Sequence, residues 1–177
     1  MAVFQTIRNL FVPGHQVESV AVLPAPPTTY SIRPLAVKHL DQVSRLNMRC
    51  FKNGENYTKH TFVYLLNEPN ALSYQIVTAS DQMVGFICVL VGDEGAAHVT
   101  TIGIAPEHRR RGLAERLLHH LETALKFRHI GSLMLEVRVS NKAAQNLYLQ
   151  KGYSIVQRVS NYYNNGEDGF MMMKSLI

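Results

Sequence analysis

The stretch APEHRRRGLAERLLHHLE (residues 105–122) places three consecutive arginines and one glycine directly before an apolar helix pattern. The leucines repeat at helical spacing and predict a helix that runs to about residue 127: Leu113, Leu117, Leu118, Leu121 and Leu125. The N-terminus of a helix already carries partial positive charge, and the arginines add like charge there. We therefore expect a negatively charged ligand at this helix start.

A phosphate group suits this arrangement. Gly112 has no Cβ and lets a ligand approach the backbone, while the first N–H groups of the helix point at one spot. Neither the Gly-Lys-Ser/Thr of the P-loop nor the three glycines of the dinucleotide fingerprint is present here. By itself the stretch also fits a solvated basic helix start or a nucleic-acid patch, although no aromatic residues interleave with the arginines.

The composition is typical of one globular domain. The chain has 177 residues, of which 46% are hydrophobic and 18% are charged, enough for a sizeable core. Eighteen Lys and Arg against 13 Asp and Glu give a net charge of +5. That excess is compatible with a nucleic acid, an acidic ligand or neither.

Cysteine and histidine spacing gives no sign of a metal or a disulfide framework. Cys50 and Cys88 lack metal-type spacing, so we expect a reducing compartment, the cytoplasm. No metal is expected either, because no metal-binding motif fits His98, His108, His119 and His120. No run approaches the roughly 20 apolar residues of a membrane span, and the first residues lack the features of a secretory signal. We expect no membrane partner.

Helix and strand patterns alternate along residues 30–177. Strands are expected at 30–35, 72–80, 82–91, 98–106, 132–140, 152–159 and 168–176, and helices at 37–51, 58–67, 113–127 and 141–151. Because hairpins occur beside helical crossovers, the predicted fold class is α+β or mixed α/β around one central sheet, in a single domain.

Residues 1–29 are predicted to be an N-terminal arm followed by a proline-rich linker, LPAPPTTY (23–30). The arm has an apolar helical face, which we expect to pack on this domain or on a second copy, so that it mediates self-association: Val3, Phe4, Ile7, Leu10 and Phe11. Deletion of residues 1–27 is then expected to change solubility or oligomeric state and to leave catalysis largely intact.

Several segments together resemble the GCN5-related N-acetyltransferase (GNAT) superfamily. The pattern Arg109-x-x-Gly112-x-Ala114 follows TIGIAP (101–106) and precedes LEVRVSNKAAQNLYLQKGY (135–153) and NYYNNGEDGFMMMKSL (161–176). This order is similar to the branch that acetylates protein N-termini, the bacterial ribosomal-protein alanine acetyltransferases and their archaeal Ard1-like relatives. GENYTKH (54–60) resembles the acceptor loop of that branch. The resemblance covers residues 30–177.

The resemblance implies a twisted mixed sheet of about seven strands whose middle strands, HVTTIGIA (98–105) and SLMLEVRV (132–139), splay apart. Acetyl-CoA is the implied co-substrate. Its pantetheine arm would pair with the backbone of Ile102, Gly103 and Ile104. Its pyrophosphate would be held by Arg109, Arg110, Arg111, Gly112, Leu113 and Ala114, with Asn141 in contact beyond it.

The resemblance also implies two catalytic residues. Glu136 is the predicted base, acting directly or through water, and Tyr148 is the predicted acid that protonates the leaving thiolate. A peptide α-amine has a pKa of about 8, so a weak base is sufficient. From the residues alone, Glu136 fits an ordinary strand carboxylate paired with Arg138 better than a base, and Tyr148 also fits a tyrosine at the core edge.

The predicted acceptor is the N-terminal amine of a protein or peptide, with a ribosomal protein among the candidates and no nucleic acid. Its predicted binding residues are Glu55, Tyr57, Tyr162 and Tyr163, although loop packing also explains Tyr162 and Tyr163, and a solvated loop acid also explains Glu55. Gly169 departs from the alanine that many relatives have there. Two alternatives stay open: acetylation of a small-molecule amine or lysine, and a non-catalytic basic protein that binds ribosomes or RNA.

Overall fold

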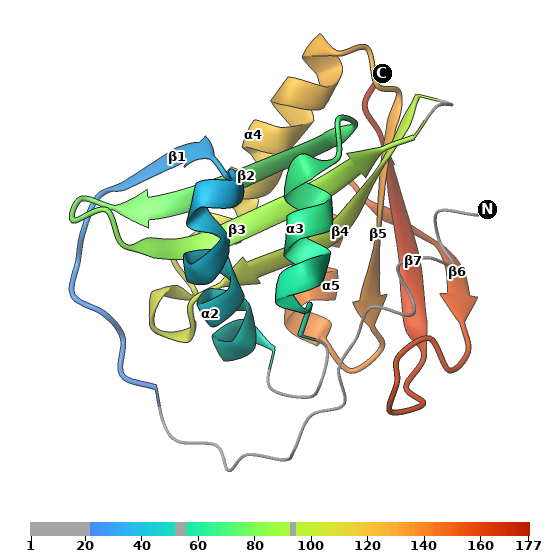
Figure 1. Cartoon of the computed structure of the whole chain (residues 1–177). Helices are drawn as coiled ribbons and strands as arrows, with labels where there is room; N and C mark the ends of the chain where they lie inside the picture. Colours follow the sequence, from blue (N-terminus) through green and yellow to red (C-terminus); the bar gives the residue numbers. More distant parts are fainter. Residues whose placement is uncertain (1–21, 52–55, 93–94) are drawn as a thin grey trace.

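The computed structural model describes residues 22–51, 56–92 and 95–177, and in them a single seven-stranded sheet (Figure 1). The strand order is β1-β2-β3-β4-β5-β7-β6. The pair β4 and β5 is parallel, and the other neighbours are antiparallel. The strands are β1 (Tyr30–Pro34), β2 (Ala71–Thr78), β3 (Met83–Val91), β4 (Ala96–Ile104), β5 (Ser132–Arg138), β6 (Ser154–Val159) and β7 (Gly169–Ser175). The predicted mixed α/β sheet of about seven strands is confirmed.

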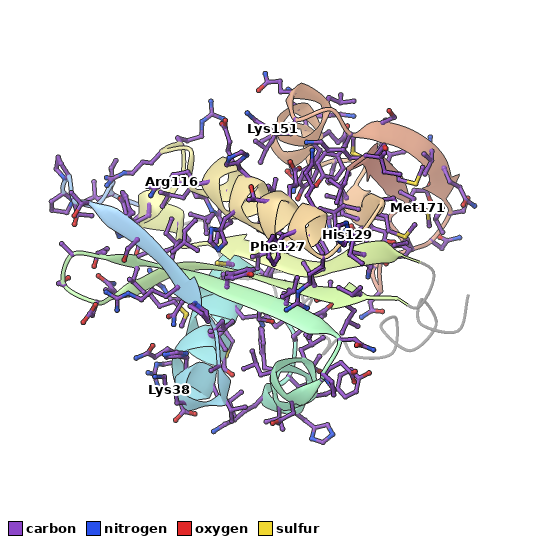
Figure 2. The ribbon with its side chains drawn as sticks, turned by 90° about the horizontal axis from the view of Figure 1, so that it is seen from above. Lys38, Arg116, Phe127, His129, Lys151 and Met171 are labelled. Atoms are coloured by element: carbon purple, nitrogen blue, oxygen red, sulfur yellow. The ribbon has the colours of Figure 1, made fainter. Side chains whose placement is uncertain are left out.

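Helices cover both faces of the sheet. The helices α2 (Leu40–Cys50) and α3 (Lys59–Asn67) lie on one face, and α4 (Leu113–Phe127) crosses the other, as Figure 2 shows from above. Helix α5 (Lys142–Gln150) lies beside α4, and an ion pair between Lys151 and Glu115 joins them. The short 3-10 turn η1 (Val37–His39) precedes α2, and a second one, η2 (Pro106–His108), follows β4.

The predicted apolar stripe of α4 is buried against the sheet. Each of its five leucines is at most 2% exposed, and β3 is buried along all but its last residue, as expected for a strand covered on both faces. Cys88 lies in that strand, and burial raises the pKa of its thiol to about 12, which makes it unreactive. No helix among the described residues is long and apolar enough to cross a membrane.

Strands β4 and β5 pair at three positions and then diverge. The pairs are Ala96–Ser132, Ala97–Leu133 and His98–Met134, whereas β4 stays paired with β3 as far as Ile104. Thr100 is an additional residue in β4, because Cys88 lies opposite Thr101 and Val89 opposite Val99. Such a bulge increases strand twist. Within the described residues, the β4 edge from 99 to 104 therefore faces β5 without a strand partner, and the predicted splay is confirmed.

The predicted apolar face of the arm, between Val3 and Phe11, lies outside the described residues. The division into residues 1–29 and 30–177 stays a prediction.

Candidate active site

A cavity of about 920 Å³ opens where β4 and β5 diverge. It is bounded by the end of β4, the turn after it, the N-terminus of α4 and one side of α5. Its wall includes most of the predicted cofactor residues and the predicted acid: Ile102, Gly103, Ile104, Arg109, Arg110, Gly112, Leu113, Ala114, Asn141 and Tyr148. Residues from four elements thus meet at one site.

The N-terminus of α4 presents free backbone donors to this cavity. Gly112 caps the helix with φ of 72°, and a Cβ built on it would meet no atom within 4 Å. The first hydrogen bond of the helix runs from the Arg116 N–H to the Gly112 carbonyl. The N–H groups of Leu113, Ala114 and Glu115, which also line the cavity, therefore have no acceptor inside the helix. These donors and the helix dipole suit a phosphate.

The three arginines before α4 have different roles. Arg109 lines the cavity and donates hydrogen bonds to the carbonyls of Ile104 and Cys50, each at 3.2 Å. Arg110 lines it with φ of 61°, a left-handed conformation that costs about 1–2 kcal/mol for a residue with a Cβ. Arg111 is not among the lining residues: its guanidinium donates to the Tyr30 hydroxyl at 2.7 Å and to linker carbonyls.

Glu136 forms a buried pair with His98, a residue that sequence reasoning did not assign to the site. The His98 Nε2 and Glu136 Oε2 atoms lie 2.6 Å apart, and the side chains are 9% and 6% exposed. Glu136 Oε1 is also buried and makes no hydrogen bond to the described residues. The only sequence signal for His98 is a polar residue inside an otherwise apolar start of β4.

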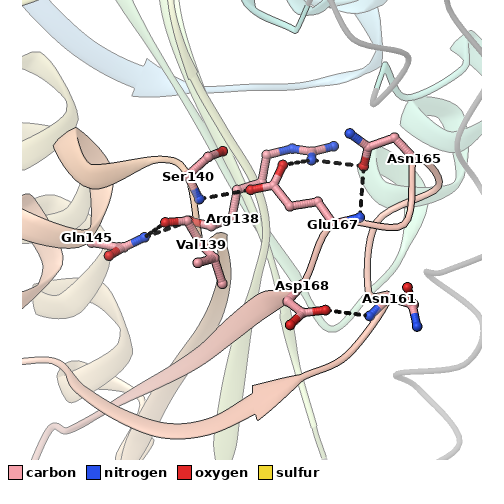
Figure 3. A network of polar contacts seen from close by, with 8 residues as sticks. All are labelled: Arg138, Val139, Ser140, Gln145, Asn161, Asn165, Glu167 and Asp168. Carbon is pink, nitrogen blue, oxygen red and sulfur yellow. Dashed lines mark hydrogen bonds and ion pairs between the residues drawn. The ribbon is translucent and has the colours of Figure 1, made fainter.

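The alternative that paired Glu136 with Arg138 is wrong. Arg138 instead forms an ion pair with Glu167 and a 3.1 Å hydrogen bond to Asn165 (Figure 3). Arg138 and Glu136 lie two residues apart on β5 and therefore share a face of the strand. Glu136 is not among the residues that line the cavity. Arg138 is, so we infer that Glu136 lies one step along the same face of β5, toward the paired strands.

Tyr148 is both buried and part of the cavity wall. Its side chain is 6% exposed, and Ala144, four residues earlier on α5, lines the same wall. Burial raises the pKa of its phenol to about 12, so the hydroxyl keeps its proton throughout the physiological range. The ring packs against Tyr153 at 5.7 Å between centroids. A protonated phenol at a cavity suits a proton donor.

Tyr148→Phe is expected to lower kcat about 10²-fold with little change in the affinity for acetyl-CoA, because it removes the proton donor alone. Tyr153→Phe is the matched control, since the Tyr153 hydroxyl hydrogen-bonds Glu122 at 3.2 Å and the residue is not in the cavity wall. The control should lower the melting temperature and leave kcat near wild type. Steady-state kinetics of both variants would contradict the acid role if Tyr148→Phe kept full turnover.

The predicted acceptor residues Tyr57 and Tyr163 lie near Glu136. The Tyr57 hydroxyl donates to the Thr100 carbonyl at 2.7 Å, at the bulge of β4. Its pKa is raised by burial first and then by Cys88, Glu136 and Tyr163. The pKa of Tyr163 is raised by burial and by Tyr162, with smaller contributions from Glu136 and Tyr148. Both tyrosines are therefore neutral hydrogen-bonding groups beside the carboxylate.

A polar network fixes the loop that carries Tyr162 and Tyr163, between β6 and β7 (Figure 3). The Glu167 carboxylate accepts from the Ser140 N–H at 2.8 Å, and the Asp168 carboxylate accepts from the Asn161 N–H at 2.9 Å. The Arg138 guanidinium lies 4.0 Å from the centre of the Tyr163 ring, and the Tyr162 ring packs edge-on against it at 5.0 Å. The loop is thus tied to the end of β5.

Gly169 begins β7 directly under Tyr162. A Cβ there would lie 3.2 Å from three atoms of that side chain, closer than ordinary contact. The glycine thus lets Tyr162 pack against the strand. Glu55, the remaining predicted acceptor residue, lies outside the described residues.

Comparison with known proteins decides the family. The model of the acetyltransferase (GNAT) family matches residues 40–153. The chain belongs to the GNAT family. This confirms the predicted family and enzyme class. The match spans the elements from α2 to the end of α5, and so includes the cavity wall other than Val22, together with Glu136 and Tyr148.

The chain is similar in sequence and structure to individual GNAT enzymes that acetylate protein N-termini. It is 38% identical over 117 residues to N-alpha-acetyltransferase 20 of Dictyostelium discoideum, covering 64% of this chain and 67% of that one. It is 30% identical to an N-alpha-acetyltransferase of Sulfurisphaera tokodaii, over 83% and 93% of the two chains. The crystal structure of the ribosomal-protein-S18-alanine N-acetyltransferase from Escherichia coli superposes with a TM-score of 0.77 at 28% identity, over 84% and 94%. These relatives support the predicted N-α-acetyltransferase activity.

Proposed function

We propose that this GNAT enzyme transfers the acetyl group of acetyl-CoA to the N-terminal amine of proteins or peptides. The observation that carries the proposal is the buried Glu136–His98 pair, which lies beside the cavity at the divergence of β4 and β5 and next to Tyr57 and Tyr163. A carboxylate, neutral tyrosines and an anion-binding helix start are the groups that this reaction requires.

The cavity fits acetyl-CoA, which supplies an activated thioester when bound. The free N–H groups at residues 113–115, together with Arg109 and Arg110, would hold the pyrophosphate. The unpaired β4 edge at residues 102–104 offers backbone donors and acceptors to the amides of the pantetheine arm. Asn141 lines the wall and caps α5, accepting the Ala144 N–H on its side-chain oxygen at 3.2 Å.

Glu136 accepts the proton of the incoming amine on Oε1, directly or through water, while His98 holds Oε2 in place. The amine nitrogen then bonds to the acetyl carbon as the carbon–sulfur bond breaks. Tyr148 donates its phenolic proton to the departing sulfur. The new amide nitrogen loses its second proton through solvent, which restores the Tyr148 phenol, and the proton held on Glu136 is released to solvent. At neutral pH, deprotonation costs roughly 1 kcal/mol for an α-amine and about 4.5 kcal/mol for a lysine amine. A carboxylate base therefore favours α-amines.

The acceptor side is aromatic and closely packed. The Thr100 carbonyl accepts a hydrogen bond from Tyr57, and the Arg138 guanidinium packs on the ring of Tyr163. Rigid tyrosines suit a short extended peptide whose first amine must point at Glu136. Ribosomal proteins with free N-termini belong among the acceptors to be tested.

Acetyl transfer to a peptide panel tests the proposal. Peptides with free N-termini that vary at the first two residues are compared with N-blocked lysine peptides and spermidine. The kcat/KM for small or Met first residues is expected to exceed that for lysine peptides at least about tenfold, from the difference in amine pKa. Equal turnover of lysine peptides or spermidine would overturn the N-terminal assignment. Acetyl-CoA binding without turnover of any amine would favour the non-catalytic alternative.

A further inference from the structure

The proline-rich linker and the preceding Val22, together residues 22–29, lie against the turn that carries the arginines. The Ala25 N–H donates to the Glu107 carbonyl at 2.9 Å. Arg111 donates to the Pro26 carbonyl at 3.1 Å and to the Ala25 carbonyl. Prolines have no N–H and cannot continue sheet pairing, so side-chain donors satisfy the carbonyls of this segment. The linker is thus bound at a defined place more than 80 residues away in sequence.

A second layer of hydrogen bonds fixes Arg111 and the end of the linker. The guanidinium also donates to the Tyr30 hydroxyl at 2.7 Å, and that hydroxyl lies 2.9 Å from Nδ1 of the buried His108. Burial lowers the pKa of His108, so its ring is neutral and Nδ1 accepts a hydrogen bond from the Tyr30 hydroxyl. Arg116 of α4 donates to the Tyr30 carbonyl at 3.0 Å. The Arg111 guanidinium therefore donates its hydrogen bonds to the linker and to Tyr30.

The start of the linker reaches the cavity. Val22 lines the same wall as Arg109 and Arg110 and is 48% exposed, whereas its neighbour Leu23 is 84% exposed and is not in the wall. The pantetheine side of the cavity lies along β4, and the anion-binding donors lie at the start of α4. The linker is hydrogen-bonded to Glu107 of η2 and to Arg111, the residues directly before those donors.

We propose that Val22 forms part of the wall of the acetyl-CoA site at its nucleotide end, and that Arg111 is a positioning residue that holds Val22 in place through the Ala25 and Pro26 carbonyls. This inference rests on the proposed function, because it extends the same site. It differs from the sequence-based predictions in two respects. Arg111 acts through the linker instead of on the pyrophosphate, and the part of the chain before residue 30 contributes to cofactor binding.

Point variants of the full chain test the wall. Val22→Asp places a negative charge beside the nucleotide and is expected to raise the calorimetric Kd for acetyl-CoA about fivefold. Leu23→Asp, the matched control, should change it less than about twofold at physiological ionic strength, because the exposed charge is screened. Neither variant should change the Kd for acetyl-4′-phosphopantetheine, which lacks the nucleotide. Both should keep the wild-type melting temperature.

A double-mutant cycle between Arg111 and Val22 tests the role of Arg111. Arg111→Lys keeps the charge but cannot donate to both linker carbonyls and Tyr30 in the same geometry. If Arg111 acts through the linker, Val22→Asp should have a smaller effect on the acetyl-CoA Kd in the Arg111→Lys background than in wild type. Additive effects, or equal effects of Val22→Asp and Leu23→Asp, would overturn the inference. Equal losses with acetyl-CoA and acetyl-4′-phosphopantetheine would overturn the assignment to the nucleotide end. Failure of the wild-type protein to bind acetyl-CoA would instead refute the proposed function.

Discussion

Glu136→Gln is expected to lower kcat for a free N-terminal peptide about 10²–10³-fold while leaving the affinity for acetyl-CoA nearly unchanged. The amide has the same shape and can still hydrogen-bond His98, so the substitution removes the proton acceptor and little else. The deficit should shrink as the pH rises above about 8, because a growing fraction of the α-amine is then already neutral. Kinetics over a pH series, with calorimetric titration of acetyl-CoA, measure both effects.

Glu122→Gln is the matched control for this variant. Glu122 is also a buried carboxylate, 8% exposed, but it lies on α4 and its partners are Lys174 at 2.7 Å and the Tyr153 hydroxyl at 3.2 Å. Its substitution breaks a partly buried ion pair and should lower the melting temperature without lowering kcat. A Glu136→Gln deficit that stays constant with pH would contradict the base role.

Gly112→Asn is expected to raise the Kd for acetyl-CoA about tenfold or more, because a side chain at this position enters the space in front of the α4 donors. Asparagine tolerates the left-handed backbone better than other residues with a Cβ, so the fold should survive. Turnover at saturating acetyl-CoA should stay close to wild type, since Gly112 caps α4, whereas Glu136 and Tyr148 belong to β5 and α5. Calorimetry and steady-state kinetics separate these two quantities.

Gly95→Asn provides the control for backbone strain. Gly95 has φ of 70° against 72° for Gly112, and a Cβ at either position meets no atom within 4 Å. Gly95 lies before β4 and is not in the cavity wall, so both variants should lose similar stability while only Gly112→Asn loses affinity. Equal affinity of the two variants for acetyl-CoA would refute the phosphate-binding role of the turn.

Local patterns in the sequence determined the elements and the anion-binding turn. The leucine spacing of α4 and the apolar run of β3 predict burial that the structure confirms, because a helix or strand presents its side chains at a fixed period. Gly112 and the arginines predict free donors at a helix start, because capping depends on a few adjacent residues. Motif order also identified the family, which the family match confirms.

The tertiary structure determined which residues far apart in sequence contact one another. Glu136 pairs with His98, which is 38 residues away, because the parallel register of β4 and β5 places both side chains where pairing ends. The three arginines are chemically identical and adjacent, yet only Arg109 and Arg110 line the cavity. Arg111 points the other way because Tyr30 and the linker carbonyls lie on that side. Partner choice depends on strand register and side-chain direction, which arise only when the sheet assembles.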